Sequence, residues 1–279
     1  FVIVWLASYP KSGNTWVRLF LNSLINNRES EIDINDIKIR QFPLRYDFAN
    51  LNIDMDKIQE FVSNCVVCQD KINLDNSIKI FKTHNALWRV GDHKFTNEEN
   101  TRGVIHIVRD PRNIITSIKN HFSRKTYDEA LEFMTDEKKS LGSKIGKKDT
   151  DLPTVVSSWS NHYNSWKKME KNYLLIKYEN LLNNPKDEFK KIIDYLDKNL
   201  NLTFDTNKIE NAIKNSEFKE LKDQENKKGF NEAAKDLNGN TKKFFFLGPE
   251  NNFRTLLNRE TTKKIEVAFK SEMLELGYL

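Results

Sequence analysis

A short polar segment between two apolar runs combines the residue types that bind anions. Residues 9–16 read YPKSGNTW, with a lysine, a hydroxyl and a glycine that permits close backbone approach. Asn14 or Thr15 is able to cap a following helix, and the free N–H groups at a helix start attract anions. The segment therefore predicts a loop that binds phosphate or sulfate. An ordinary strand-to-helix turn with one exposed lysine is the alternative.

The runs on either side of this segment predict the elements that hold it. Residues 2–7 are apolar and partly β-branched, which is typical of a buried strand. Residues 16–25 carry apolar side chains at helical spacing. Lys11 precedes the loop's only glycine, whereas the Walker A loop of kinases and ATPases places its lysine after a glycine. The order of residues therefore disfavours a nucleotide-dependent kinase.

A second group of reactive side chains closes a predicted strand at residues 77–84. Lys82, Thr83 and His84 are its last residues. A histidine just past a strand end is able to act as a general base, because its ordinary pKa is close to neutral pH. A structural or surface histidine is the more common alternative for any single histidine.

The other histidines of the chain, which has five, have simpler explanations. His106 lies inside a predicted strand and is expected in the core. His121 lies at a predicted helix end, where a positive charge is favourable. His93 and His162 are expected at the surface.

A third segment begins at Arg109, directly after the apolar residues 104–108. Ser117 follows about two turns into a predicted helix at residues 113–121. A planar guanidinium suits phosphate oxygens, and a nearby hydroxyl adds a hydrogen-bond donor. The pair is compatible with a second phosphate site, with a structural ion pair for Arg109 as the alternative.

These three segments resemble the sulfotransferases that use 3′-phosphoadenosine 5′-phosphosulfate (PAPS) as donor. The resemblance spans most of the chain, roughly residues 3–278. It implies that the first segment binds the 5′-phosphosulfate, that His84 is the catalytic base, and that Arg109 and Ser117 bind the 3′-phosphate. The catalytic residues that it implies are His84, Lys11 and Lys82. The cofactor-binding residues that it implies are Lys11, Ser12, Gly13, Asn14, Thr15, Trp16, Arg109, Ser117, Tyr178, Phe218 and Gly248.

The resemblance also implies the reaction. A sulfuryl group would pass in line from PAPS to a hydroxyl or amine of a small molecule or a glycan. Lys11 and Lys82 would stabilise the negative charge that develops, and no metal would be required. Tyr178 would contact the adenine, and the rings of Trp16 and Phe218 would sandwich it. Plain core packing is the alternative for these three aromatic residues.

The sequence departs from the family near its C-terminus. Residues 246–254 read FLGPENNFR where many cytosolic members have Arg-Lys-Gly, two further residues and Gly-Asp-Trp-Lys. Gly248 is retained, but Phe246 and Leu247 replace the two cations. Loss of one charge-assisted phosphate contact costs about 1.5–3 kcal/mol. The cations that are candidates to compensate are Lys242, Lys243 and Arg254.

Composition narrows the class of protein further. The chain has 279 residues, and 45 basic against 40 acidic residues give a net charge of +5. That excess suits an anionic cofactor and is too small and dispersed to indicate nucleic-acid binding. No apolar run reaches the roughly 18 residues of a membrane span, and we expect the apolar N-terminal run to be a strand rather than a signal peptide. A lone C-x-x-C pair at Cys65 and Cys68 is weak evidence for zinc and favours two thiols on a partly buried helix. We expect a cytoplasmic enzyme, and the sequence does not determine its oligomeric state.

Strands that alternate with helices predict the fold class. A further strand is expected at residues 173–178, and further helices at residues 55–67, 159–171, 186–196, 208–215, 218–221 and 260–276. This pattern favours a three-layer α/β fold with a mostly parallel central sheet flanked by helices. The resemblance makes it the P-loop-NTPase-like sulfotransferase fold, in one domain over residues 1–279. The strand ends should then meet in a single crevice.

The sequence does not identify the acceptor. Its pocket would be shaped by four loops at residues 40–55, 85–100, 122–150 and 225–245, with Phe42, Trp88, Phe122 and Tyr127 as candidate walls. A lysine-rich run at residues 138–151 would meet an anionic acceptor or, more simply, be a solvated charge run. It contains Lys138, Lys139, Lys144, Lys147 and Lys148. A P-loop-type kinase and a non-catalytic module that binds the nucleotide or sulfated ligands are the alternatives to a sulfotransferase.

Overall fold

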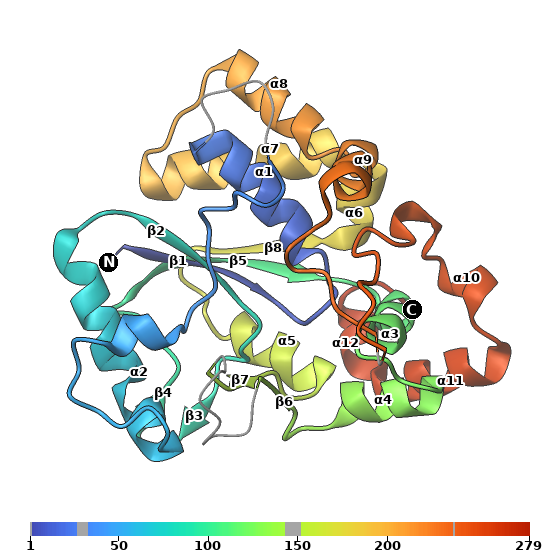
Figure 1. The fold of residues 1–279 in the computed structure, drawn as a ribbon, viewed down its shortest axis with the longest axis horizontal. Coiled ribbons are helices and arrows are strands. Elements are labelled where there is room, and N and C mark those ends of the chain that lie inside the picture. Colours follow the sequence, from blue (N-terminus) through green and yellow to red (C-terminus); the bar gives the residue numbers. More distant parts are fainter. Residues whose placement is uncertain (1, 27–32, 143–151, 237) are drawn as a thin grey trace.

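Four parallel strands form the central sheet of the computed structural model (Figure 1). Their order is β2 (Lys79–Thr83), β1 (Ile3–Ser8), β5 (Thr101–Val108) and β8 (Tyr173–Lys177). All three neighbouring pairs are parallel, so the prediction of a parallel sheet is confirmed. The structure describes residues 2–26, 33–142, 152–236 and 238–279.

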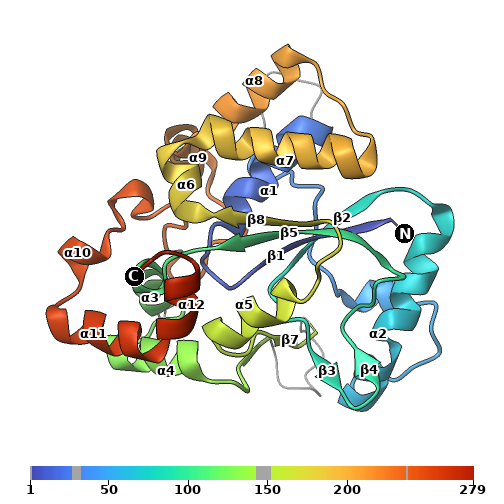
Figure 2. The same cartoon turned by 180° about the vertical axis from the view of Figure 1, so that it is seen from behind.

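Helices cover both faces of this sheet, which makes the three layers that the sequence predicts (Figures 1 and 2). On one face lie α1 (Asn14–Asn26), α7 (Pro185–Leu200) and α8 (Thr206–Asn215). On the other lie α2 (Ile58–Ile72) and α5 (Trp159–Lys167). Every residue of β1 is buried, because both faces of a parallel sheet are covered in this architecture.

An aromatic core fills the space under the face that α2 and α5 cover. The ring of Trp5 lies 5.5 Å from Phe42 and 5.1 Å from Phe95, and its indole nitrogen donates to the Thr101 hydroxyl at 3.0 Å. Phe42 is fully buried in this cluster, and Trp88 packs against Phe95 in it. The prediction that Phe42 and Trp88 form acceptor walls is therefore wrong, because apolar burial places both rings in the core.

The remaining elements follow the sheet strands or pack around them. Beyond the sheet strands and the five helices named above, the described residues form the helices α3 (Pro111–His121), α4 (Tyr127–Thr135), α6 (Tyr178–Asn183), α9 (Phe218–Lys228), α10 (Phe253–Leu256), α11 (Arg259–Ala268) and α12 (Lys270–Glu275), with single 3₁₀ turns at Arg45–Phe48, Asn73–Asp75 and Gly248–Glu250. Two short hairpins pair β3 (Arg89–Val90) with β4 (His93–Lys94) and β6 (Ser140–Leu141) with β7 (Thr154–Val155). No helix in these ranges is long and apolar enough to cross a lipid bilayer.

Some predicted element bounds are wrong. The helix expected over residues 260–276 is two helices, because Phe269 leaves the helical conformation and packs its buried ring 5.2 Å from Trp159. The helix expected at 218–221 continues to Lys228, and the loop expected over 122–150 contains α4. The two thiols do lie on a helix, where Cys65 and Cys68 are buried and burial raises the pKa of Cys68 to about 12.

Candidate active site

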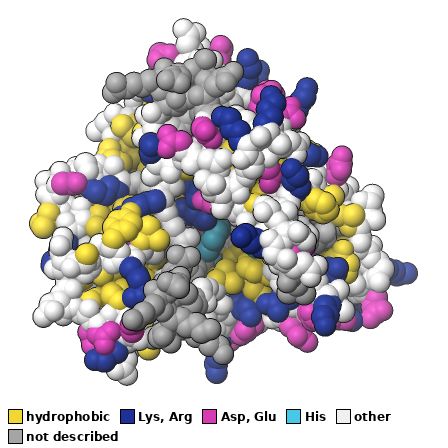
Figure 3. Space-filling view, in the orientation of Figure 1, with side chains coloured by type: hydrophobic (Ala, Val, Ile, Leu, Met, Phe, Trp, Pro, Cys, Tyr) yellow, Lys and Arg dark blue, Asp and Glu magenta, His cyan; other side chains and the backbone are white. Residues whose placement is uncertain are grey.

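A pocket of about 410 Å³ lies beyond the C-terminal ends of the four sheet strands. The space-filling view shows a hollow in this face with histidine at its floor and lysine or arginine at its rim (Figure 3). The loops after β1, β2, β5 and β8 reach it, and a C-terminal segment, residues 242–254, contributes further walls. The predicted site residues that line it are Lys11, Gly13, Asn14, Thr15, Trp16, Lys82, His84, Arg109, Ser117, Tyr178, Phe218 and Gly248. Ser12 is not among the lining residues.

The loop at residues 9–16, here called the phosphate loop, turns sharply between β1 and α1. Lys11 and Gly13 have φ angles of 67° and 100°, and the Ser12 N–H donates to the Tyr9 carbonyl at 3.3 Å. A Cβ on Gly13 would lie 2.5 Å from the ring of Tyr178, so only glycine fits here without displacing that ring. Ser12 is fully buried and its hydroxyl has no hydrogen-bond partner.

Asn14 ties the phosphate loop back to the strand that precedes it. Its side-chain nitrogen donates to the Leu6 carbonyl at 3.0 Å and to the Ser8 hydroxyl at 3.1 Å. The sequence made Asn14 or Thr15 the candidate to cap α1. The Asn14 amide does not do so. It fixes the position of the loop against β1 instead.

Lys11 is half-buried among other cations. Burial, together with the charges of Arg109 and Lys82, lowers the pKa of its ammonium to about 8. Its ammonium lies 4.3 Å from the centre of the Phe244 ring. Clustered cations of this kind repel one another unless an anion lies between them, so the site fits a polyanionic ligand.

His84 is held in one tautomer. Its Nδ1 lies 2.8 Å from the Ser8 carbonyl oxygen, which accepts hydrogen bonds but cannot donate one. Nδ1 therefore carries the proton, and Nε2 keeps its lone pair. Burial, reinforced by the charge of Lys82, holds the pKa of His84 well below its ordinary value. The ring is thus neutral near pH 7, in the form that a general base requires.

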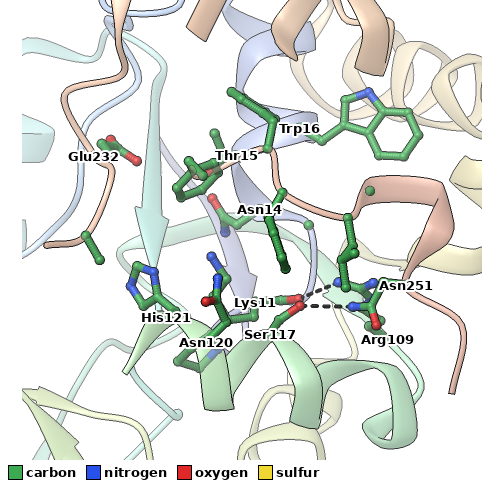
Figure 4. A pocket seen from close by; sticks show the side chains of 18 of the residues that line it. Lys11, Asn14, Thr15, Trp16, Arg109, Ser117, Asn120, His121, Glu232 and Asn251 are labelled. Atoms are coloured by element: carbon green, nitrogen blue, oxygen red, sulfur yellow. Dashed lines mark hydrogen bonds between the residues drawn. The ribbon is translucent and has the colours of Figure 1, made fainter. Parts of the chain in front are cut away.

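Arg109 is fixed between the phosphate loop and an aromatic ring. One guanidinium nitrogen donates to the Lys11 carbonyl at 3.1 Å, and the guanidinium carbon lies 4.0 Å from the centre of the Tyr178 ring. Its Nε is buried without a partner. Figure 4 shows Arg109 and Ser117 on the same side of the pocket, so the structure brings together the pair that the spacing singled out.

The remaining histidines differ in part from expectation. His106 is in the core of β5 and His93 is exposed, as expected. His162 is fully buried, so its predicted surface position is wrong; its ring packs edge-on against Tyr9 and beside His106. His121 ends α3 as expected but lines the pocket, where burial and the charge of Lys11 lower its pKa to about 4. It is therefore neutral rather than a cation at the helix end.

Glu232 is a pocket residue that the sequence did not single out. Its carboxylate pairs with the buried guanidinium of Arg18, and its other oxygen lies 3.8 Å from the Lys82 ammonium. Burial opposes its ionisation, but the charges of Lys82 and Arg18 outweigh burial and lower its pKa. An acid in a polar loop carries no signal of such a contact, because Arg18 is 214 positions away.

The C-terminal segment packs glycine against an aromatic ring at the predicted adenine side. A Cβ on Gly248 would lie 2.2 Å from the ring of Phe218. Phe246, which replaces a family cation, is half exposed. The lysines suggested as replacements donate elsewhere: Lys242 to the Ser123 hydroxyl at 2.9 Å and to the Asn120 carbonyl, and Lys243 to Asn226 at 2.8 Å. The exposed Arg254 lies 4.8 Å from the Phe253 ring.

Apolar side chains also line the pocket. Phe122, Leu141 and Ala234 line it together with Gln41 and His121. Phe122 was predicted here, whereas the predicted Tyr127 is not among the lining residues. Of the predicted basic run, Lys138 is exposed and Lys139 pairs with Asp136 at 3.6 Å. Lys144, Lys147 and Lys148 lie outside the described residues.

The unpartnered polar atoms at this site fit an anionic nucleotide. Buried polar groups normally have hydrogen-bond partners. The Ser12 hydroxyl and Arg109 Nε, both able to donate, are buried and have none, and they lie at or beside a pocket lined by Lys11 and Lys82. Within the ranges that the structure describes, no three His, Cys, Asp or Glu side chains cluster as metal ligands would.

Comparison with known proteins gives related results from sequence and from structure. Sulfotransferase 1 family member D1 of Mus musculus is 26% identical over 206 residues, which cover 71% of this chain and 59% of that relative. Sulfotransferase 1B1 of Canis lupus familiaris is 24% identical over 279 residues, covering 96% of this chain and 82% of that relative. The chain thus spans less than two thirds of the mouse relative.

Solved structures share the fold. Mouse sulfotransferase SULT7A1 was solved in complex with PAP, which is 3′-phosphoadenosine 5′-phosphate, the nucleotide that remains after PAPS has lost its sulfuryl group. Its TM-score is 0.57 at 18% identity, and the match covers 98% of this chain and 84% of that chain. Retinol dehydratase, in complex with androsterone and inactive cofactor PAP, has a TM-score of 0.60 at 17% identity, covering 97% and 80%. The family model of the sulfotransferase domain matches residues 3–277. The chain therefore belongs to the sulfotransferase family.

Proposed function

We propose that this protein transfers a sulfuryl group from PAPS to a hydroxyl or amine of a small-molecule or glycan acceptor, as one domain over the whole chain. The single observation that carries the proposal is the state of His84. A neutral histidine, with its Nδ1 proton committed to a carbonyl, lies in the same pocket as Lys11 and Lys82. A base and the cations that stabilise developing negative charge are the two requirements of sulfuryl transfer.

Each residue has a stated role in this proposal. Bound PAPS supplies the electrophilic sulfuryl group. His84 Nε2 accepts the proton of the acceptor hydroxyl, and the Ser8 carbonyl keeps the imidazole in the required tautomer and orientation. As the acceptor oxygen bonds to sulfur, the bond between sulfur and the 5′-phosphate oxygen breaks and PAP leaves. Lys11 and Lys82 would stabilise the negative charge that develops on the sulfuryl oxygens and on the departing 5′-phosphate.

The nucleotide-binding roles follow the shape of the pocket. Arg109 and Ser117 lie together on one side, where they would hold the 3′-phosphate. Trp16 and Phe218 would enclose the adenine beside Tyr178, since all three rings line the same cavity. Related structures contain PAP, which supports nucleotide use by this site.

An apolar hydroxyl compound is the acceptor class that the pocket supports best. Phe122, Leu141 and Phe244 line the pocket together with His84. Relatives of this chain are named for luciferin and for flavonol, and a structural neighbour is a complex with retinol. These names describe those proteins, and here they support a screen that begins with phenols and small alcohols.

Substitution of the base tests the proposal. His84→Ala should lower turnover with labelled PAPS by about 10²- to 10⁴-fold, the usual contribution of a general base. The affinity for PAP should change little, because His84 is not placed on the nucleotide. Retention of most of the wild-type rate would overturn the base assignment.

A ligand titration separates the two rival functions. A kinase would bind adenosine triphosphate in preference to PAP, whereas the proposed enzyme prefers PAP. A non-catalytic module would bind PAP and transfer no sulfuryl group to any acceptor in the screen. The exposed Phe246 in place of a cation is the feature that keeps this module as a rival.

A further inference from the structure

Asn251 lines the pocket and follows closely after Phe246 and Leu247, the two residues that replace cations of the family sequence. It is 7% exposed and belongs to the C-terminal segment, yet its side chain reaches α3. Its Nδ2 donates to the Asn113 carbonyl at 2.9 Å and to the Ser117 hydroxyl at 3.0 Å. Figure 4 shows Asn251 beside Ser117 and Arg109, with the bond to Ser117 as a dashed line.

The orientation of this amide is fixed by one of its partners. A backbone carbonyl only accepts hydrogen bonds, so the atom that faces the Asn113 carbonyl must be the nitrogen. Both hydrogens of Nδ2 are then used, one on the Asn113 carbonyl and one on Ser117. The Oδ1 atom is left buried and without a partner.

This orientation determines what Ser117 is able to do. A hydroxyl that accepts a hydrogen bond from Asn251 still has its own hydrogen to donate. In the part of the chain that the structure describes, Ser117 Oγ makes one hydrogen bond, the one that it accepts from Asn251. Since Ser117 lines the pocket, its hydrogen is available to a ligand there.

The nearby cations do not take over this role. Lys242 donates to Ser123 and Asn120, and Lys243 donates to Asn226. Arg112 is committed to Asp110 at 2.7 Å and to Glu266 at 2.6 Å. Arg109, which Figure 4 shows beside Ser117, has a buried guanidinium Nε without a partner.

We propose that Asn251 is a positioning residue for donor recognition: it directs the Ser117 hydroxyl hydrogen toward the nucleotide's 3′-phosphate and so sets the preference for a 3′-phosphorylated nucleotide. A neutral amide that acts through a hydroxyl thus does part of the work of the missing cations. This inference rests on the proposed function, because it takes the 3′-phosphate to lie at Arg109 and Ser117.

Two nucleotides that differ only in the 3′-phosphate test the inference by binding alone. The dissociation constants of PAP and of adenosine 5′-monophosphate are measured by calorimetry for the full chain and its variants. Asn251→Ala should weaken PAP about fivefold to tenfold, the effect of one misdirected hydrogen bond, and leave the monophosphate unchanged. Asn252→Ala is the matched control, since Asn252 is the exposed neighbouring amide and caps α10. Its ratio of affinities should equal that of the wild type.

Two further variants separate positioning from general damage. Asn251→Asp should lower the preference for PAP more than Asn251→Ala, because a carboxylate takes the Ser117 hydrogen and repels the phosphate. In a Ser117→Ala background, Asn251→Ala should have no further effect on the ratio.

The outcomes distinguish the inference from the proposed function. Equal weakening of both nucleotides by Asn251→Ala, or full additivity with Ser117→Ala, would overturn the role of Asn251 while the sulfotransferase proposal stands. A wild-type protein that prefers PAP no more than the monophosphate would overturn the role of Asn251 and also the placement of the 3′-phosphate at Arg109 and Ser117. A wild-type protein that binds neither nucleotide would overturn both.

Discussion

The phosphate loop and the C-terminal segment face the same pocket but are held in place in different ways. The loop is tied to its own strand, through Asn14 bonds to Leu6 and Ser8 that span eight and six positions. The C-terminal segment is tied to α3 by side chains: Asn251 reaches Ser117 across 134 positions, and the Phe253 N–H reaches Asn113 across 140. Apart from the Arg109 bond to the Lys11 carbonyl, the hydrogen bonds that hold the loop are therefore local in sequence, whereas those of the C-terminal segment are not.

Under the proposed function, this difference would give the two regions different parts of donor recognition. The loop would supply backbone geometry and the half-buried Lys11 to the donor's 5′-phosphate. The C-terminal segment would supply neutral contacts at the far end of the nucleotide. Changes in the loop should therefore affect all nucleotides alike, and changes in the segment should affect discrimination between them.

Removal of the loop's cation should have the largest effect on binding. Lys11→Ala should weaken PAP and adenosine 5′-monophosphate by about 10- to 100-fold each, since a charge-assisted phosphate contact contributes about 1.5–3 kcal/mol. Calorimetry on both nucleotides measures this. A loss confined to PAP would place Lys11 on the 3′-phosphate and remove the proposed contrast between the two regions.

The same substitution at one glycine in each region is a direct comparison. Gly13→Ala and Gly248→Ala each place a Cβ within about 2.5 Å of a ring, at positive φ. Tyr178 is 8% exposed and is fixed under Arg109, whereas Phe218 is half-buried beside an exposed turn. Gly13→Ala should therefore weaken PAP about tenfold or more, and Gly248→Ala less, because strained φ angles and immovable neighbours cost about 1–2 kcal/mol or more.

Nucleotide titrations and thermal unfolding of both variants measure this pair. Thermal unfolding shows whether each variant remains folded. Equal losses at the two glycines would mean that the C-terminal segment is as rigid as the loop.

The local half of the site is the half that could be predicted from the sequence. Alternating strands and helices imply a parallel sheet, and the ends of parallel strands meet at one edge. Lys11, His84 and Arg109 each follow such a strand, so their convergence needed no knowledge of tertiary contacts. The glycine of the phosphate loop also stood out in the sequence, although the ring that excludes a Cβ there, Tyr178, belongs to a distant element.

The rest could not be predicted, because it depends on which distant side chains meet. Nothing local distinguishes Asn251 from its neighbour Asn252, although one is buried against α3 and the other is exposed. His162 lies on a helix that could equally have faced water, and its burial follows from Tyr9 and His106 in other elements. Glu232 meets Arg18 only once the chain has folded.

The pH dependence of nucleotide affinity should follow the charge of Lys11 in the phosphate loop. Because the pKa of Lys11 is lowered to about 8, the residue is mostly protonated at pH 7 and loses its proton above pH 8. Phosphate binds the protonated form, so PAP affinity should be full well below pH 8, be about twofold weaker near pH 8 and fall by at most tenfold per pH unit above it. Lys11→Arg should remove this dependence between pH 7 and pH 9.5, since a guanidinium stays charged. A wild-type affinity that is flat over this range would contradict the assigned pKa.

The smallest effect is expected where the loop preceding the C-terminal segment touches the helix of the phosphate loop. Glu232→Gln removes the carboxylate that pairs with Arg18, whose side chain is 2% exposed, while Glu232 itself is 37% exposed. Partial exposure screens the pair, so the free energy of unfolding should fall by about 1–2 kcal/mol, a loss of a few degrees in Tm. PAP affinity should instead rise slightly, because a negative charge 3.8 Å from Lys82 is lost.

The control is Asp33→Asn, which removes an exposed pair with Lys228 and should change neither quantity. A fall in both stability and affinity would show that Glu232 supports the site rather than opposing the donor's charge.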